Sequence, residues 1–359
     1  MNEFLAWTRL AFRNLYVSEP LPNARTEPPS EFFKLARQHR VVGLWAAAGL
    51  APGWKSHAYG QALYAARCTE EAERLYARFA QVIPAIGLIK GPTLAVQAWP
   101  QLGLRHYDDL DFRCGKEDVD ALAAVLLSLG YVPETSDSNR QANLWHFGWG
   151  IAFVKGDGLR VEVNHRLFPP HYPAPARFEG VREAIWTQLA LDQGAVQTLA
   201  PAAHLLYCSM HAVWHGWDRL GWVVDMAGLM TRYPDVVEKA RQLAGETGFP
   251  RRALEAACHV ANGLFGPLPG ADEPDDAGDG DLGDAVALLM QTADRRVAAR
   301  RLQRRLCSRT EWIGSTLRRA LTPGDPDFQR WSLPAARRYR YWLLRPTRLL
   351  VRATASAGS

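Results

Sequence analysis

Apolar and polar residues alternate along the chain in patterns that predict helices at both ends and strands between them. Residues 1 to about 80 space apolar side chains three and four apart, as in LAWTRLAFRNLY and EFFKLARQHRVVGLWAAAGL, which predicts amphipathic helices. A third, longer helix is expected from His57 to Val82. The helical spacing returns from about Ala176 to Leu264 and again in the last seventy residues.

Short apolar runs bounded by Gly, Pro and Asp lie between these helical regions and predict strands. The run from Ala85 to Ile89 is expected to be a buried strand. Lys90-Gly91-Pro92 ends it, and Pro92 suits the first turn of a helix that runs to about Ala98, because that position needs no N–H. A loop follows, and a second strand is expected from Asp108 to Cys114.

The next elements complete a small sheet. A helix is predicted from Lys116 to Leu129, with Gly130 as its C-terminal cap. Strands are predicted from Leu144 to Val154 and from Leu159 to Leu167, joined at a turn that contains Asp-Gly, which favours a hairpin. The chain is therefore expected to have an α+β fold, in which a small mixed β-sheet core is flanked by N-terminal and C-terminal helical regions.

Composition shifts suggest where these parts begin and end. The segment FGPLPGADEPDDAGDGDLG is rich in Gly, Pro and Asp and is expected to be a flexible acidic linker. The predicted segments are a helical region (1–80), a core (81–170), a helical domain (171–264), the linker (265–285) and a basic C-terminal region (286–359). We expect the core to fold without the C-terminal region.

Two acidic residues on the second predicted strand indicate a metal site. Asp109 and Asp111 are two apart in a strand, so their carboxylates point to the same side. Hard oxygen ligands of this kind suit Mg²⁺ or Mn²⁺. Gly91 allows the backbone to approach a bulky anion, the following helix start can hold a phosphate, and Lys90 and Arg105 add positive charge. Together these features favour metal-dependent transfer from a nucleoside triphosphate.

The motifs LIKG, LGLRHYDDLDF and VEVNHRLF resemble those of bacterial nucleotidyltransferases of the DNA polymerase β type. The similarity covers roughly residues 82–229, and it is to a branch that has Lys-Gly where better-known members have Gly-Ser or Gly-Gly. The resemblance implies that Asp109 and Asp111 are the first two metal carboxylates and that Glu162 is the third. From the chemistry of the turn, we expect Lys90, Gly91 and Arg105 to hold the triphosphate.

The expected function is therefore Mg²⁺- or Mn²⁺-dependent transfer of a nucleoside monophosphate from an NTP to an unidentified acceptor: a small molecule, a peptide, a protein or RNA. Two alternatives stay open. One is transfer of another phosphate-activated group, such as a sugar, because the site chemistry requires only a metal-bound diphosphate. The other is a nucleotide- or partner-binding module that retains the fold without catalysis.

Several histidines and one arginine are further candidates for substrate contacts. His211 and His215 are four apart and share a helical face, but position 212 is alanine, so the HExxH zinc motif is absent. The resemblance extends to His211, His215, Trp222 and Asp225, for which helix packing and nucleotide or acceptor contact are both open. Arg219 and His165 are also possible substrate contacts.

Composition and charge narrow the setting. Hydrophobic residues make up 48% and charged residues 22% of the chain, as in ordinary globular proteins. Five scattered cysteines without a CxxC pair, a polar N-terminus and short apolar runs favour a cytoplasmic protein. Residues 291–359 contain sixteen Arg, no Lys and four acids. This C-terminal region is interpreted in three ways: as a solvated helix face, as a contact to an anionic membrane surface that would make the protein peripheral, or as a nucleic-acid contact.

Overall fold

The chain forms two compact units, each assembled from non-consecutive stretches. In the computed structural model, residues 2–21, 28–83, 85–172, 176–180, 185–271, 303–306 and 308–357 are described. The first unit comprises Met1–Ala77, Gly87–Leu110 and Ala174–Cys307. The second unit comprises Arg78–Ile86, Asp111–Pro173 and Ser308–Ser359.

The N-terminal region is helical, as the apolar spacing predicted. Its helices are α1 (Asn2–Val17), α2 (Phe32–Gln38), α3 (Val42–Ala47) and α4 (Lys55–Phe79). Helices α1 and α3 pack against each other, and the Phe4 ring of α1 lies 5.0 Å from the fully buried ring of Trp45. This burial of aromatic faces is what the amphipathic pattern of the segment anticipates.

The strand–turn–helix–strand sequence predicted for the start of the core is confirmed. Strand β1 (Gly87–Ile89) is buried and leads into α5 (Gly91–Ala98), which has a proline in its first turn. A short 3-10 turn, η2 (Leu102–Leu104), precedes β2 (Asp109–Arg113). The apolar residues of β1 place it inside the protein, and Pro92 starts α5 because its fixed φ angle is already helical.

The region from Ala176 to Leu264 was predicted to be entirely helical, and this prediction is wrong in part. After α8 (Ala176–Gly180), a hairpin of β6 (Trp186–Ala190) and β7 (Ala195–Leu199) comes before the helices. The hairpin turn closes with the N–H of Leu191 donating to the carbonyl of Gly194 at 2.9 Å. β7 contacts β1, so the hairpin is part of the core of the first unit.

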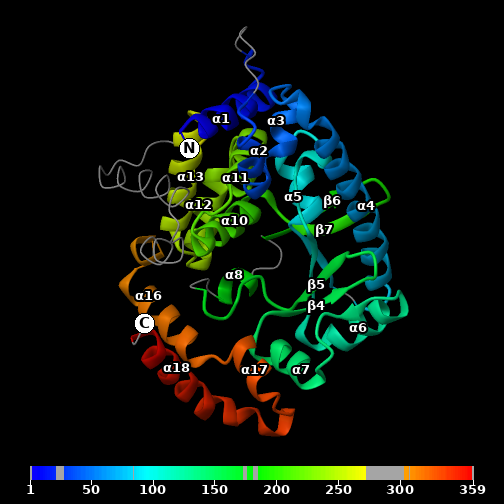
Figure 1. The fold of residues 1–359 in the computed structure, drawn as a ribbon, viewed down its shortest axis with the longest axis vertical. Helices are drawn as coiled ribbons and strands as arrows, with labels where there is room; N and C mark the ends of the chain where they lie inside the picture. The colour runs from blue at the N-terminus through cyan, green and yellow to red at the C-terminus, as the bar shows by residue number, and fades with distance from the viewer. Residues whose placement is uncertain are drawn as a thin grey trace. The chain divides into compact units, whose positions relative to one another are not determined.

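Four helices follow the hairpin in the first unit and bury a large part of its apolar side chains. They are α10 (Pro201–His215), α11 (Leu220–Arg232), α12 (Val236–Thr247) and α13 (Arg251–Phe265), drawn in green and yellow in Figure 1. Helix α10 contacts the other three, and α11 also packs on α5. The α5–α11 contact matters for the site, because α5 begins at the Lys90-Gly91 turn.

The second unit contains α6 (Val119–Ser128), β3 (Val132–Pro133), β4 (Gly150–Val154) and β5 (Arg160–Asn164). β4 and β5 form the predicted antiparallel hairpin, with Ala152 opposite Glu162. The strand order of the five-stranded sheet is β1-β2-β5-β4-β3. Strand β2 belongs to both units, since the unit boundary follows Leu110.

The predicted strand from Leu144 to Val154 is wrong in its first half. Residues Ser138–Phe147 form α7, and the strand starts only at Gly150. Asp137 caps this helix, because its carboxylate accepts the N–H of Arg140 at 3.0 Å, and Gly148 ends it. An N-terminal cap supplies a partner for an N–H group that the first helical turn leaves unsatisfied, and here it outweighs the apolar run that suggested a strand.

The C-terminal helices pack on α7, so they contact the core that we expect to fold without them, and that expectation stays a prediction. These helices are α16 (Arg309–Leu321), α17 (Asp325–Trp331) and α18 (Tyr341–Ala357). The buried side chain of Asn143 on α7 donates to the carbonyl of Leu333 at 2.7 Å. The predicted linker at 265–285 lies mostly outside the described residues, as do residues 286–302.

The fold is α+β, with a small mixed sheet and helices before and after it in the chain, as predicted. Among the described helices, none has the length and apolar character needed to cross a membrane.

Candidate functional site

The turn between β1 and α5 holds its backbone in a conformation that few residues adopt. Lys90 has φ 53° and Gly91 has φ 41°. A lysine at positive φ costs on the order of 1–3 kcal/mol and persists only where its surroundings enforce it. Thr93 donates its hydroxyl to the carbonyl of Lys90 at 2.8 Å, and Thr198 on β7 donates to the Thr93 hydroxyl at 2.9 Å.

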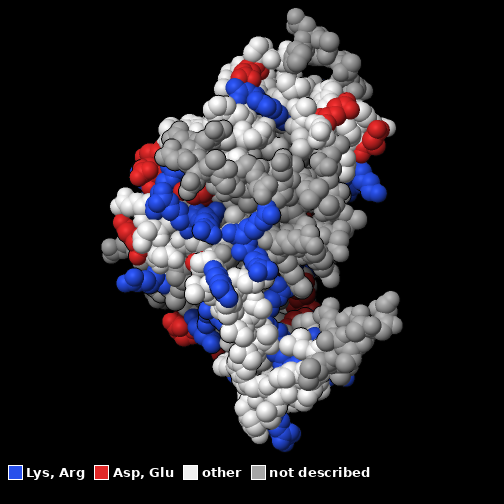
Figure 2. All heavy atoms as spheres, turned by 90° about the vertical axis from the view of Figure 1, so that its left-hand side faces the viewer, with Lys and Arg blue, Asp and Glu red and all other residues white. Residues whose placement is uncertain are grey.

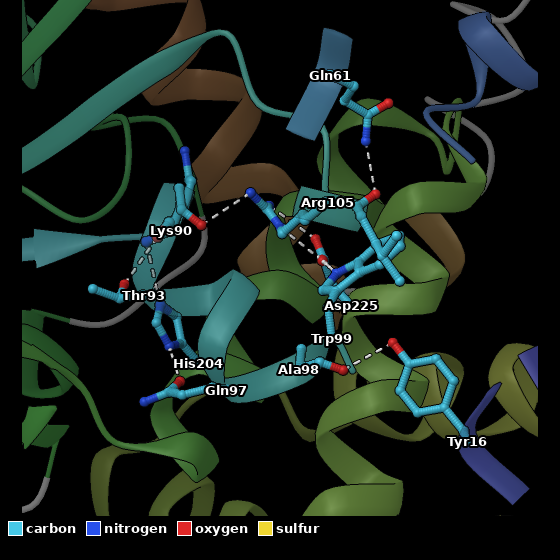
Figure 3. A network of polar contacts seen from close by, with 12 residues as sticks. Tyr16, Gln61, Lys90, Thr93, Gln97, Ala98, Trp99, Arg105, His204 and Asp225 are labelled. Atoms are coloured by element: carbon cyan, nitrogen blue, oxygen red, sulfur yellow. Dashed lines mark hydrogen bonds and ion pairs between the residues drawn. The ribbon is translucent and has the colours of Figure 1, made fainter. Parts of the chain in front are cut away.

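A buried histidine holds the other side of the same turn. The backbone N–H of Lys90 donates to Nε2 of His204 at 3.4 Å, and Nδ1 of His204 lies 2.5 Å from Oε1 of Gln97 (Figure 3). The Gln97 amide donates to the carbonyl of Leu199 at 2.9 Å, so its oxygen is the atom that faces the imidazole. Burial, with the charges of Arg105 and Lys90, lowers the pKa of His204 to about 3, and the ring is neutral at pH 7.

Arg105 and Asp225 form a buried, two-point ion pair behind the turn (Figure 3). The guanidinium donates to both carboxylate oxygens, at 2.8 and 3.0 Å, and its remaining nitrogen lies 3.5 Å from the carbonyl of Gly91. Trp99 also donates to Asp225, at 2.6 Å. Burial opposes the charge on Arg105, but Asp225 outweighs it and the pKa of Arg105 is raised. Arg105 thus ties the turn to α11, and its predicted phosphate contact stays a prediction.

The side chain of Lys90 lies beside the histidine-bearing face of α10. Its ammonium group is 5.2 Å from the centre of the Tyr207 ring, and Tyr207 stacks on His211. His211 and His215 are in ring contact at 4.5 Å. Burial and the charge of Lys90 lower the pKa of His211, so this imidazole is neutral. The structure therefore groups His211 and His215 with Lys90, while their contact to substrate stays a prediction.

Further positive charge lies within electrostatic reach of Asp109. Arg219 sits 5.5 Å from the centre of the Trp222 ring. Burial lowers the pKa of Arg40, the charges of Asp108 and Asp109 oppose that effect, and Arg219 adds to it. Arg40 also forms an ion pair with Asp108. A cation at Arg40 was not among the residues singled out from the sequence, although it lies in the Q-H-R segment between α2 and α3.

Strand β2 carries the two candidate metal carboxylates. Asp109 is half-buried and Asp111 is buried, with one residue between them, so both point to the same side of the strand. The side-chain amide of Asn164 on β5 donates to Asp111 at 3.3 Å. Glu162 lies two residues before Asn164 on β5 and therefore shares its face. Asp111, Asn164 and Glu162 thus project from one face of the second unit's strands.

Glu162 already has a cationic partner in the structure. It forms an ion pair with Arg160, and Arg160 also binds Glu134 at 3.1 Å. His165 is buried against Trp145 at 4.5 Å, and burial with nearby positive charge lowers its pKa to about 3. Neither result tests the predicted roles of Glu162 and His165 toward metal and substrate, which stay predictions.

The donor set of β2 fits a hard divalent cation in number and kind. Within the described part of the chain, no three His, Cys, Asp or Glu side chains are grouped as a complete metal site. Mg²⁺ in phosphoryl-transfer sites is commonly held by one or two carboxylates, with water and substrate phosphates as its other ligands. Asp109 and Asp111 fit that requirement, and the amide of Asn164 orients Asp111 as second-sphere groups orient metal ligands.

Sequence reasoning missed the residues that hold the site in place. These are Asn164, Gln97, His204 and Thr198. Asn164 stands in the motif VEVNHRLF, two residues after Glu162, so the two-residue period of a strand identifies it. His204 and Thr198 act through tertiary contacts with Lys90 and Thr93, which no local pattern in the sequence predicts.

Comparison with known proteins matches residues 26–266 to the model of a family described as uncharacterised nucleotidyltransferase, which covers about two thirds of the chain. No curated protein matches the chain significantly.

Proposed function

The chain belongs to this uncharacterised nucleotidyltransferase family, and from that premise we propose that it transfers a nucleoside monophosphate from an NTP to an acceptor in a metal-dependent reaction. The observation that carries the proposal is the pair of carboxylates on one side of β2, Asp109 and Asp111, with Asn164 bound to the second. Paired carboxylates that follow a strained, cation-bearing turn suit the handling of a triphosphate.

Asp109 and Asp111 would hold Mg²⁺ or Mn²⁺. A divalent cation held by these carboxylates would supply positive charge to offset the negative charge of the donor's phosphate groups. The carboxylates supply the negative charge that retains the cation, and Asn164 fixes the orientation of Asp111. Glu162 is proposed as the third carboxylate because it shares a strand face with Asn164. To do so, it would exchange its contact with Arg160 for one with the metal or the acceptor.

The Lys90-Gly91 turn is proposed to hold the triphosphate. Its strained backbone starts α5, whose first-turn N–H groups and positive dipole end favour anions. The ammonium of Lys90 adds a point charge, and His211, His215 and Arg219 lie on the same side as this ammonium. Arg105 is proposed to act through the carbonyl of Gly91, which its Nη1 approaches at 3.5 Å, so its role is to position the turn.

The experiment that tests this proposal follows the label on the donor. The protein is incubated with each NTP labelled at the α-phosphate or at the γ-phosphate, with Mg²⁺ and a bacterial extract as a source of acceptors. Nucleotidyl transfer puts the α-label on an acceptor and releases pyrophosphate that carries the γ-label. Transfer of the γ-label alone would show a kinase and contradict the proposal. A parallel incubation with labelled nucleotide sugars tests the sugar-transfer alternative.

We further propose that the C-terminal helices place the protein at an anionic membrane surface. Helix α16 exposes Ile313, Leu317 and Leu321 at 47, 55 and 54% of their surface, spaced four apart on one face. Arg318 and Arg319 are exposed on the same helix. Figure 2 shows the Lys and Arg side chains of the described residues on one side of the protein. An apolar stripe beside arginines suits the boundary between lipid headgroups and acyl chains.

A further inference from the structure

A pocket in the first unit has no role in the site described so far. It has a volume of about 560 Å³, which lies within the range of small-molecule sites. It is lined by helix α2, the segment between α2 and α3, helix α4 and the loop before β2. The side chains that matter most are Phe33, Lys34, Arg37, Arg40, His57 and His106.

The lining of this pocket is cationic. Lys34, Arg37 and Arg40 all face it, and none of its lining residues is a carboxylic acid. Arg40 is engaged by Asp108, which leaves Lys34 and Arg37 as the cations that a ligand meets first. Both are exposed on α2. The guanidinium of Arg37 lies 5.9 Å from the centre of the Phe33 ring, a cation–π contact that limits where it can point.

Aromatic contacts and a side-chain hydrogen bond hold the wall of the pocket in place. Phe33 packs edge-on against His57 at 4.6 Å and against Trp54 at 5.2 Å. The amide of Gln61 on α4 donates to the carbonyl of Leu104 at 2.8 Å (Figure 3). A Cβ placed on Gly43 would approach that carbonyl to 2.8 Å, so only glycine permits this close packing. The wall is thus built before any ligand arrives.

The pocket is electrostatically coupled to Asp109, one of the two candidate metal carboxylates. Arg40 and Tyr64 both line it, and the charge of Asp109 acts on the pKa of each. His106 also lines it and lies 2.7 Å from Asp108, the neighbour of Asp109 in the chain. A molecule bound to Lys34 and Arg37 would therefore extend toward the start of β2.

We propose that this pocket binds an anionic group, a phosphate or a carboxylate, carried by the acceptor. The assignment to the acceptor rests on the proposed function. The donor's phosphates already have a cationic turn at Lys90, whereas the cations on α2 lie on a different element. The mixture of cations, histidines and aromatic rings suits an organic anion of the size of a sugar phosphate.

Calorimetric titration without metal or NTP tests the pocket itself. The probes are inorganic phosphate, glucose 6-phosphate, glucuronate and, as the neutral control, glucose. Inorganic phosphate is small enough to reach the cations whatever the rest of the acceptor looks like. The variant is Lys34→Gln with Arg37→Gln, and the matched control is Arg252→Gln, an exposed arginine on α13.

The double variant is expected to bind the anionic probes at least tenfold more weakly than wild type, or about 1.4 kcal/mol, whereas Arg252→Gln binds them as wild type does. Equal binding of every probe by both variants would overturn the proposal. Metal-free ATP is titrated as a further probe. If ATP competes with phosphate, and the double variant weakens the binding of ATP and of phosphate by the same factor, the pocket binds the donor and the assignment to the acceptor is wrong. Loss of phosphate binding in the variant, alongside no α-label transfer, would keep the anion pocket and reject the transferase.

Discussion

Lys90 shows how one residue can be both strained and useful. Its positive φ angle is enforced from two sides, by Thr93 at its carbonyl and by His204 at its N–H. The ammonium group of Lys90 lies over the Tyr207 ring of α10, and helix α5 starts at the next residue. The strain is therefore consistent with a turn organised for an anion, since functional sites are where such conformations tend to occur.

Replacing Lys90 with alanine should weaken NTP binding about ten- to hundredfold, because a charge-assisted hydrogen bond contributes roughly 1.5–3 kcal/mol. Alanine keeps the backbone penalty of a non-glycine residue at this φ angle, so the change isolates the charge. Calorimetric titration with a non-hydrolysable NTP at fixed Mg²⁺ measures the dissociation constant. Lys155→Ala is the control, since Lys155 makes the same kind of ring contact at 5.2 Å. Equal dissociation constants for all three proteins would remove Lys90 from the site.

His204 should make the stability of the protein depend on pH. Its folded-state pKa of about 3 lies below the ordinary value of 6.5, so between these values only the unfolded chain takes up the proton. Stability is then fully present above about pH 6.5 and falls by up to about 1.4 kcal/mol per pH unit as the pH is lowered toward 3. Urea unfolding of wild type and His204→Gln at pH 7, 6 and 5 measures the difference. Parallel pH dependence in the two proteins would show that His204 is not held neutral.

At the scale of elements, the sequence predicted the helices and strands that have a local sequence pattern of their own. Strand β1, helix α5 and strand β2 follow directly from an apolar run, a Gly-Pro turn and alternation. The hairpin of β6 and β7, which turns at Asp192-Gln193-Gly194, was missed because the helical spacing after Ala200 was extended backwards over it. The hairpin supports α5 through tertiary contacts, because Thr198 and the carbonyl of Leu199 bind Thr93 and Gln97 of that helix.

The exposed face of α16 gives a prediction about the surroundings of the protein. Changing Ile313, Leu317 and Leu321 together to serine should lower affinity for vesicles containing 30% phosphatidylserine by roughly tenfold or more, since burying each such side chain contributes up to about 1.5–3 kcal/mol. Vesicle co-sedimentation measures this, with neutral vesicles as the reference. If wild type and variant instead bind single-stranded RNA equally and neither binds vesicles, the surface is a nucleic-acid contact.

At the scale of the whole molecule, the sequence predicted the fold class and the carboxylate strand but not how the chain is divided. Both units combine stretches that are far apart in sequence. The basic C-terminal region looked separate because an acidic Gly/Pro segment precedes it in the sequence, yet Phe328 and Tyr341 are fully buried and pack with Phe147 of α7. The arginine-rich composition of this region predicts an exposed segment. The contacts with α7 depend on only a few apolar residues in it, so composition does not predict them.

Removing residues 308–359 should therefore destabilise the second unit. The deletion takes away the partners of Asn143 and uncovers Phe147, and loss of a single buried phenylalanine costs about 3–5 kcal/mol. Urea unfolding followed by tryptophan fluorescence measures this, with Leu343→Ala as a control because Leu343 is 70% exposed. A truncated protein as stable as wild type would show that these helices do not support α7.

Metal binding by β2 is the central claim, and Mn²⁺ electron paramagnetic resonance tests it most directly. Free Mn²⁺ is titrated against the protein and a non-hydrolysable NTP, using wild type, Asp109→Asn, Asp111→Asn and the exposed control Asp120→Asn. We predict that wild type and Asp120→Asn bind Mn²⁺ alike. Each of the two β2 variants should bind it at least tenfold more weakly, because a carboxylate ligand becomes a neutral amide. Equal Mn²⁺ affinity in all four proteins would contradict the account.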